Sequence, residues 1–200
     1  MHLRVVLTGG IATGKSYCLG RFSALGAFVV DADELAHQVV EPDTSGFNMV
    51  ITRFGPEYVR DDGTLDRKKL ASLIFADERA RRDLEAIIHP AVYVAIEAWF
   101  ARHRRGIAIA DIPLLYETGR ERAFDRVIVA ACPPALQLTR LTTRDRLSTD
   151  EAQRRIASQM PIDEKKERAD FVIETSGSFE ETNTQVLDVW DRLRRETLPM

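Results

Sequence analysis

Five short runs of apolar residues are spread along the chain, and within each run the apolar positions are nearly continuous. The runs cover residues 3–8, 27–33, 107–112, 126–132 and 170–174. A half-buried strand alternates apolar and polar residues, whereas a strand of a parallel sheet is buried on both faces and has an almost unbroken apolar run. The pattern therefore predicts five strands of one parallel sheet.

Stretches of helical character separate these runs, so that strands and helices alternate along the chain. This order predicts an α/β fold with a doubly wound, five-stranded parallel sheet. Right-handed crossovers place the carboxyl ends of all the strands at one edge of the sheet, which is where ligands bind in this fold class. We expect the functional site at that edge.

A long helical insertion is predicted between the second and third strands, because residues 34–105 far exceed one crossover helix. Asp66 can cap one helix of this segment. A second helix is expected from residue 77 toward residue 104, interrupted at Pro90. Functional insertions cluster at the ligand edge, which favours a substrate-binding role over mere extra packing.

Two sequence signals predict helix starts in the second half of the chain. Ser148 followed by Glu151 has the form of a capping box, and Ser178 with Glu181 repeats it. The first of these lies in an arginine-rich helical segment, residues 137–168, between the fourth and fifth strands. No linker or internal repeat is visible in the sequence, so we predict a single domain.

Composition and charge narrow the function classes. The 200 residues are 44% hydrophobic and 30% charged, with a formal net charge of −3, as in an ordinary folded protein. A nucleic-acid-binding protein usually has a basic surplus, and this chain has none overall. No stretch approaches the roughly 18 uninterrupted apolar residues of a membrane span. We expect a cytoplasmic protein without nucleic-acid or membrane partners.

One motif follows the first apolar run and opens a helix: GGIATGKS, residues 9–16, which fits G-x-x-x-x-G-K-[ST]. Glycines permit the backbone angles that turn consecutive N–H groups inward on a phosphate, and the helix adds the positive end of its dipole. Lys15 can reach the β- and γ-phosphates, and Ser16 Oγ can ligate Mg²⁺. This phosphate-binding loop (P-loop) predicts binding of ATP and Mg²⁺.

A P-loop alone does not separate a kinase from a GTPase or a motor. A GTPase reads its base with an Asn-Lys-x-Asp motif, and no Asn-Lys pair occurs in this chain. Residues 43–46 match D-x-x-G, but no apolar strand precedes them, so we interpret the match as coincidence. The chain is short for a motor, and a small-molecule kinase is the best remaining class.

Carboxylates end two of the predicted strands. Asp33 is our candidate for the base that accepts or orients the proton of the acceptor hydroxyl. Asp31 falls on the same side of an extended strand and could compete for this role or bind Mg²⁺. Asp33 could also simply cap the following helix. Asp111, at the end of the third strand, could hold Mg²⁺ through water or orient a loop.

Three arginines follow the fourth strand. Arg140 and Arg144 fall on one helical face, so two guanidinium groups could point at one phosphate cluster. For Arg146 a solvated helix face is an equally good interpretation. The expected nucleotide contacts are Gly10, Ile11, Ala12, Thr13, Gly14, Lys15, Ser16, Tyr17 and Arg144.

Further motifs, in order and nearly from end to end, resemble one family, dephospho-coenzyme A kinase. They are residues 7–11 (LTGGI), 31–33 (DAD), 41–42 (EP), 62–65 (DGTL), 89–90 (HP), 113–117 (PLLYE), 137–141 (QLTRL), 144–145 (RD), Gln159 and 169–173 (ADFVI). The resemblance implies an alcohol phosphotransferase that uses ATP on the ribose 3′-hydroxyl of dephospho-coenzyme A, the last step of coenzyme A biosynthesis.

The resemblance also implies roles for residues and segments. By it, Asp33 faces the acceptor hydroxyl, Lys15 and Arg140 act on the phosphates, and the acceptor site is lined by His89, Pro113 and Leu114. Without it, a helix-packing role for His89 would be the better interpretation. Within residues 1–200 it implies a P-loop kinase core (1–33, 106–136 and 169–200), a helical acceptor-binding insertion (34–105) and an arginine-bearing lid (137–168).

The chain departs from the family pattern at two places. Tyr17 stands where Ser or Thr is usual, and residues 174–177 (ETSG) replace an Asp-Asn-x-Gly run. The second change puts nucleobase preference and ATP affinity in question. The rival interpretations are a nucleoside, shikimate or gluconate kinase and, from another class, a non-catalytic module that binds a nucleotide.

Overall fold

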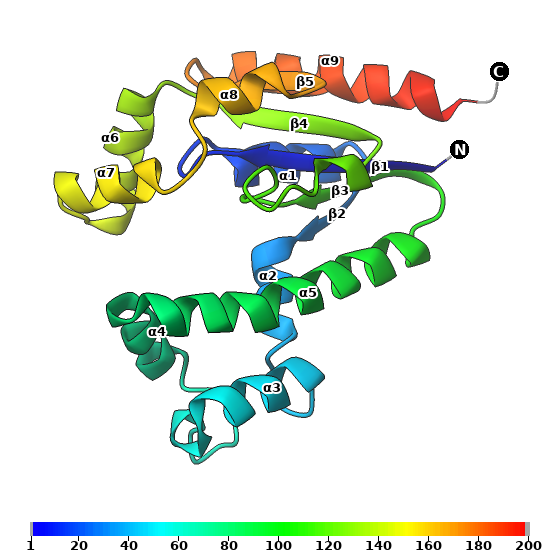
Figure 1. Ribbon diagram of the computed structural model, residues 1–200. Helices are drawn as coiled ribbons and strands as arrows, with labels where there is room; N and C mark the ends of the chain where they lie inside the picture. Colours follow the sequence, from blue (N-terminus) through cyan, green and yellow to red (C-terminus); the bar gives the residue numbers. More distant parts are fainter. Residues whose placement is uncertain (1, 199–200) are drawn as a thin grey trace. The chain divides into compact units, whose positions relative to one another are not determined.

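The computed structural model, which describes residues 2–198, contains a five-stranded sheet surrounded by helices (Figure 1). Its strands are β1 (His2–Gly9), β2 (Phe28–Asp31), β3 (Gly106–Asp111), β4 (Arg126–Ala131) and β5 (Phe171–Glu174). They lie in the order β2-β3-β1-β4-β5, and every neighbouring pair is parallel. The predicted doubly wound parallel sheet is confirmed.

The described residues form nine α-helices. They are α1 (Lys15–Ala24), α2 (Ala32–Gln38), α3 (Ser45–Phe54), α4 (Arg67–Ala76), α5 (Glu78–Arg102), α6 (Pro134–Asp145), α7 (Thr149–Ala157), α8 (Ile162–Glu167) and α9 (Phe179–Thr197). Two short 3₁₀ helices are η1 (Pro56–Tyr58) and η2 (Glu121–Ala123). The capping boxes predicted at Ser148 and Ser178 are both present, and Asp66 caps α4.

The core explains the unbroken apolar runs. Alternate residues of β1, β3 and β4 face α1 and α9, and the intervening residues face the other side of the sheet, so both sets are buried. The cluster under α1 and α9 contains Val5, Leu7, Phe22, Ile109, Ile128, Val186, Val189 and Leu193. Full burial of one such side chain contributes about 1.5–3 kcal/mol, so this cluster holds β1, and the loop that follows it, in place.

The second strand is shorter than predicted. β2 ends at Asp31, and the backbone turns into α2 at Ala32, which places Asp33 in the first turn of that helix. The expected side-by-side alternation of Asp31 and Asp33 is therefore wrong, because a period of two residues applies only to extended backbone. Asp111 ends β3 as predicted.

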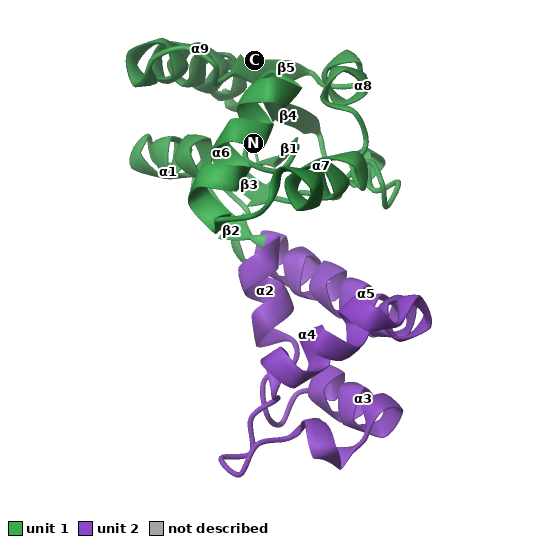
Figure 2. Cartoon of the chain, turned by 90° about the vertical axis from the view of Figure 1, so that its left-hand side faces the viewer, with its two compact units in different colours: residues 1–31, 102–200 green, residues 32–101 purple. Residues whose placement is uncertain are grey.

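The chain divides into two compact units, residues 32–101 and the remainder of the described chain (Figure 2). The unit of residues 32–101 has its own hydrophobic cluster, which includes Val40, Val50, Phe54, Leu70 and Leu84. The other unit contains the whole sheet. Of the segment limits predicted above, residues 1 and 199–200 lie outside the described residues, and the roles assigned to the segments remain predictions.

Helix α5 runs unbroken through Pro90, so the predicted interruption there is wrong. A proline inside a helix costs about 3 kcal/mol because it removes a hydrogen bond and crowds the preceding turn. Buried residues on both sides, such as Leu84 before it and Ile96 after it, offset that cost and keep one continuous axis.

Helix α5 is also, among the described residues, the one helix whose length and apolar content would suffice to cross a membrane. A single helix of this kind is weak evidence for a span, since a core helix passes the same test. Its buried positions include Leu84, Val92 and Trp99.

Candidate active site

The P-loop joins β1 to α1 as a tight turn around an open concavity. Thr13 donates to the Gly10 carbonyl oxygen from both its backbone N–H (3.3 Å) and its hydroxyl (2.8 Å). Gly14 caps α1 with a φ of 87°, a left-handed conformation that favours glycine. The first N–H groups of α1 have no acceptor within the helix. The loop therefore presents N–H donors and the positive end of a helix to an anion.

Two glycines of this loop are closely approached by neighbouring atoms, a backbone oxygen at Gly9 and the end of a flexible side chain at Gly10. A Cβ at Gly9 would lie 2.3 Å from the Ala130 carbonyl oxygen of β4, and one at Gly10 would lie 2.3 Å from Gln137 Nε2. Backbone atoms of a central strand cannot move aside cheaply. The backbone of the P-loop at Gly9 is therefore packed directly against β4, and this contact fixes the position of the loop relative to the sheet.

We expect the substitution Gly9→Ala to destabilise the protein by about 1–3 kcal/mol, because the new methyl group overlaps a backbone carbonyl. Urea unfolding measures the loss, and nucleotide titration should show weaker binding because the loop must shift. Gly20→Ala is the matched control: no atom lies within 4 Å of its added Cβ in mid-helix, so stability should rise by about 0.5–1 kcal/mol. Unchanged stability of Gly9→Ala would contradict the clash.

Two glutamine side chains hold the peptide groups on either side of Ile11. Gln159 Oε1 accepts from the Ile11 N–H (2.7 Å), and Gln137 Nε2 donates to the Ile11 carbonyl oxygen (2.8 Å). Gln137 comes from α6, and Gln159 from the turn between α7 and α8. Both were part of the family resemblance, but no pattern in the sequence places them against the P-loop.

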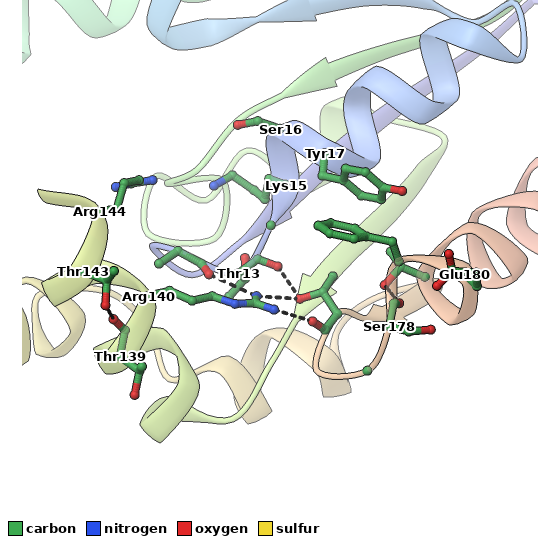
Figure 3. A pocket seen from close by; sticks show the side chains of 16 residues that line it. Thr13, Lys15, Ser16, Tyr17, Thr139, Arg140, Thr143, Arg144, Ser178 and Glu180 are labelled. Carbon is green, nitrogen blue, oxygen red and sulfur yellow. Dashed lines mark hydrogen bonds between the residues drawn. The ribbon is translucent and has the colours of Figure 1, made fainter.

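A cavity of about 860 Å³ opens beside the P-loop (Figure 3). This volume is in the range of small-molecule sites. The cavity is lined by Ala12, Thr13, Gly14, Lys15, Ser16, Tyr17, Thr139, Arg140, Thr143, Arg144, Thr175, Gly177, Ser178, Phe179, Glu180 and Thr182. It brings together six of the eight predicted P-loop contacts with both predicted α6 arginines. Gly10 and Ile11 are not among the lining residues. They contact Gln137 and Gln159 instead.

The two α6 arginines differ in their surroundings. Arg140 donates to the Thr175 carbonyl oxygen (2.6 Å), to the Thr175 hydroxyl (3.1 Å) and to the Ala12 carbonyl oxygen (3.4 Å). Arg144 pairs with Asp145 through two contacts (2.7 and 3.0 Å), and this hydrogen bonding raises the pKa of Arg144. In Figure 3 the charged ends of Lys15 and Arg144 point toward one another. Arg146 ends α6 in a left-handed conformation, with a φ of 53°.

Thr175 connects the loop after β5 to the P-loop. Its buried hydroxyl donates to the Thr13 carbonyl oxygen (2.6 Å) while it accepts from Arg140. At the other departure from the family pattern, the Tyr17 hydroxyl donates to Asn183 Oδ1 (2.8 Å), and its ring lies 4.8 Å from that of Phe179. Each unusual residue therefore buttresses a wall of the cavity, a role for which the sequence contained no signal.

The predicted acidic residues occupy different elements. Asp31 and Asp111 are partners in the register of β2 and β3, and Asp111 is also opposite Leu7 of β1, just before the P-loop. Asp33 and His89 belong to the unit of residues 32–101, whereas Pro113 and Leu114 belong to the other unit. Their expected convergence on an acceptor remains a prediction.

The described residues contain no group of three or more His, Cys, Asp or Glu side chains that could hold a metal. Such a cluster is not needed for Mg²⁺ in a nucleotide site, because that ion keeps several waters and is held by phosphates and one or two protein oxygens. Ser16, in the first turn of α1 and on the cavity wall, supplies a hydroxyl oxygen of the type that Mg²⁺ prefers. The donor set fits the ion.

Comparison with known proteins gives consistent results along the chain. A family model described as dephospho-CoA kinase matches residues 3–181. A dephospho-CoA kinase from Anaeromyxobacter dehalogenans is 50% identical, covering 89% of this chain and 86% of the relative. One from Bacillus licheniformis is 43% identical, covering 98% of this chain and 100% of the relative. A dephospho-CoA kinase domain-containing protein from Danio rerio is also 43% identical, with coverages of 94% and 80%.

Solved structures agree. A Thermus thermophilus protein superposes with a TM-score of 0.79 at 32% identity, covering 96% of this chain and 99% of the other. A dephospho-CoA kinase from Campylobacter jejuni has a TM-score of 0.75 at 27% identity, with coverages of 99% and 100%. A shikimate kinase from Acinetobacter baumannii shares the fold alone, with a TM-score of 0.56 at 16% identity over 98% of this chain and 96% of that chain.

Proposed function

The chain belongs to the dephospho-coenzyme A kinase family, and from this premise we propose that it transfers the γ-phosphate of ATP to the ribose 3′-hydroxyl of dephospho-coenzyme A. The observation that carries the proposal is the family match, which extends from residue 3 to residue 181 and includes the P-loop and the segments on which the acceptor would bind. The products are ADP and coenzyme A, and the reaction is the last step of coenzyme A biosynthesis.

The polyphosphate of ATP occupies the P-loop concavity in this proposal. N–H groups of residues 12–16 donate to phosphate oxygens, and Lys15 neutralises charge on the β- and γ-phosphates. Bound Mg²⁺, held by Ser16 Oγ and phosphate oxygens, would supply further neutralisation of that charge. Arg140, which bonds to Thr175 and Ala12 on the cavity wall, acts on the phosphates together with Lys15. Arg144 releases Asp145 and binds the nucleotide.

Asp33 accepts the hydrogen bond of the acceptor 3′-hydroxyl and takes up its proton. A bond forms between the 3′ oxygen and the γ-phosphorus, and the bond between that phosphorus and the β–γ bridging oxygen breaks, so that ADP leaves. His89, Pro113 and Leu114 contact the acceptor. Closure of residues 137–168 over the nucleotide excludes water, which would otherwise hydrolyse ATP.

The segments take the roles that the resemblance implies. Residues 34–105 bind the acceptor, which is supported by the separate hydrophobic cluster of residues 32–101. Residues 137–168 act as the lid, which is supported by Arg140 and Arg144 on the cavity wall. The net charge of −3 supports a small-molecule substrate and the absence of nucleic-acid partners. We further propose a cytoplasmic location without membrane attachment.

Incubation of the protein with ATP, Mg²⁺ and dephospho-coenzyme A should yield a product that carries one additional phosphate, which mass spectrometry detects and NMR assigns to the 3′ position. Chelation of Mg²⁺ should lower turnover at least about tenfold, and added Mg²⁺ should restore it. Faster ADP release with shikimate, gluconate or a nucleoside would favour a rival kinase. ATP binding without acceptor-stimulated ADP release would favour a non-catalytic module.

A further inference from the structure

Lys165 is a fully buried lysine of the proposed lid, residues 137–168, and has no individual role in the proposal above. It lies in α8, and its side chain has no solvent exposure, whereas that of the next residue, Lys166, is 35% exposed and pairs with Glu174. Lysine is almost never fully buried unless its charge is paired. A buried ammonium group at this position therefore calls for a structural or functional reason.

The ammonium group of Lys165 contacts two residues of one loop. Its Nζ contacts Glu117 Oε1 (2.8 Å) and donates to the Pro113 carbonyl oxygen (3.1 Å). Both residues belong to the segment after β3, residues 113–117, called here the 113–117 loop. One ammonium group thus binds both the first and the last residue of this loop.

The same loop is tied to the P-loop. The Pro113 carbonyl oxygen also accepts from the hydroxyl of Thr8 (3.3 Å), the residue that immediately precedes the P-loop glycines. Glu117 Oε1 also accepts from the Met160 N–H (2.9 Å), next to Gln159, which bonds to Ile11. Two routes therefore connect Lys165 and the 113–117 loop to the phosphate-binding turn.

The energetics argue for a geometric role. Burial lowers the pKa of Lys165, and the hydrogen bond to Glu117 acts in the opposite direction. At Glu117 burial favours a higher pKa, but the bonds from Lys165 and the Met160 N–H prevail, and the pKa is lowered. In this pair the ammonium group is fully buried, whereas the Glu117 side chain is 21% exposed. Burying an ionised group costs free energy that its partner often only offsets, so stability alone is a weak reason for the pair. The contacts of Lys165 do, however, fix the positions of Pro113 and Glu117 in the 113–117 loop.

Resting on the proposed function, we propose that Lys165 and Glu117 form a positioning pair that holds the 113–117 loop for the acceptor. Leu114, which follows Pro113, is 38% exposed and can contact a ligand. The next residue, Leu115, is fully buried and attaches the loop to the core. The positioning pair thereby fixes the location of Pro113 and Leu114 relative to the P-loop. A loop displaced by about 1 Å can cost on the order of 100-fold in rate.

The test is the substitution Lys165→Met, which keeps the length of the side chain and removes its charge. We expect kcat/KM for dephospho-coenzyme A to fall on the order of 10–100-fold, mainly through KM, while the Kd of a non-hydrolysable ATP analogue changes less than about twofold. Lys166→Met, which removes the neighbouring exposed charge, should leave both constants unchanged. An unaltered acceptor KM, or an equal loss of nucleotide affinity, would overturn the proposal.

The double variant Lys165→Met with Glu117→Gln guards against misfolding, because it leaves no unpaired buried charge. If the pair positions the loop, this variant should fold and still show the raised acceptor KM. Recovery of a normal KM would mean that the pair only balances charge, and the proposal would fall. The wild-type protein in the same assay separates this outcome from failure of the proposed function, which would appear as no acceptor phosphorylation at all.

Discussion

Replacement of Lys15 by methionine is expected to lower kcat for acceptor phosphorylation by a factor on the order of 10²–10³, equivalent to about 3–4 kcal/mol of transition-state stabilisation. Lys15 follows the glycine that caps α1, and it lines the cavity together with Ser16. In the proposed reaction its ammonium group neutralises the negative charge that accumulates on the β–γ bridge as the phosphoryl group leaves. Steady-state ADP release at saturating ATP measures the effect.

Folding should be unaffected by this change, because Lys15 is at the surface of the cavity and not in the core. Arg192→Met provides a matched loss of one positive charge: this side chain is 58% exposed in α9 and pairs with Asp188. Its kcat should equal that of the wild-type protein. A Lys15→Met variant with wild-type kcat would remove the P-loop from the chemistry.

The second large effect is expected for Asp33→Asn, which should reduce kcat on the order of 100-fold while nucleotide affinity stays nearly constant. Asparagine keeps the shape of the side chain but accepts no proton. The residue is exposed in the first turn of α2. Single-turnover measurements with acceptor and ATP separate the chemical step from binding.

Glu34→Gln is the matched control, since it removes a carboxylate from the same helical turn. Its turnover should match that of the wild-type protein. Asp31→Asn tests the rival carboxylate, which lies in β2 beside Asp111. A large loss for Asp31→Asn together with normal turnover of Asp33→Asn would transfer the role of base to Asp31.

Short-range signals predicted most of the fold correctly. The five apolar runs became the five strands, and the capping boxes at Ser148 and Ser178 start α7 and α9 as expected. Two predictions that applied a local rule were wrong, one on the end of the second strand and one on the helix that contains Pro90. The strand predicted through Asp33 ends at Asp31, and α5 continues through Pro90 because buried residues on both sides hold it.

In the candidate site, too, features set by local sequence were predicted and features set by tertiary packing were not. The P-loop glycines, Lys15 and Ser16 were recognisable because their spacing is a local requirement of phosphate binding. Arg140 and Arg144 could be placed on one face of a helix from their separation of four residues. That Arg140 bonds to Thr175 and Ala12 depends on how α6 meets the loop after β5, and no local pattern encodes this.

The order of residues along the chain was enough to specify the parallel sheet and the phosphate-binding turn, because periodicity, caps and motif spacing act over a few neighbouring residues. The family was indicated by the resemblance of motifs spread along the chain. Packing alone decided which distant side chains support that turn. Gln159 reaches Ile11, Thr175 reaches Thr13, and Lys165 reaches Glu117 across long stretches of sequence. Such contacts depend on how the helices pack against the sheet, since their geometry is set by buried surfaces and not by the residues adjacent in the chain.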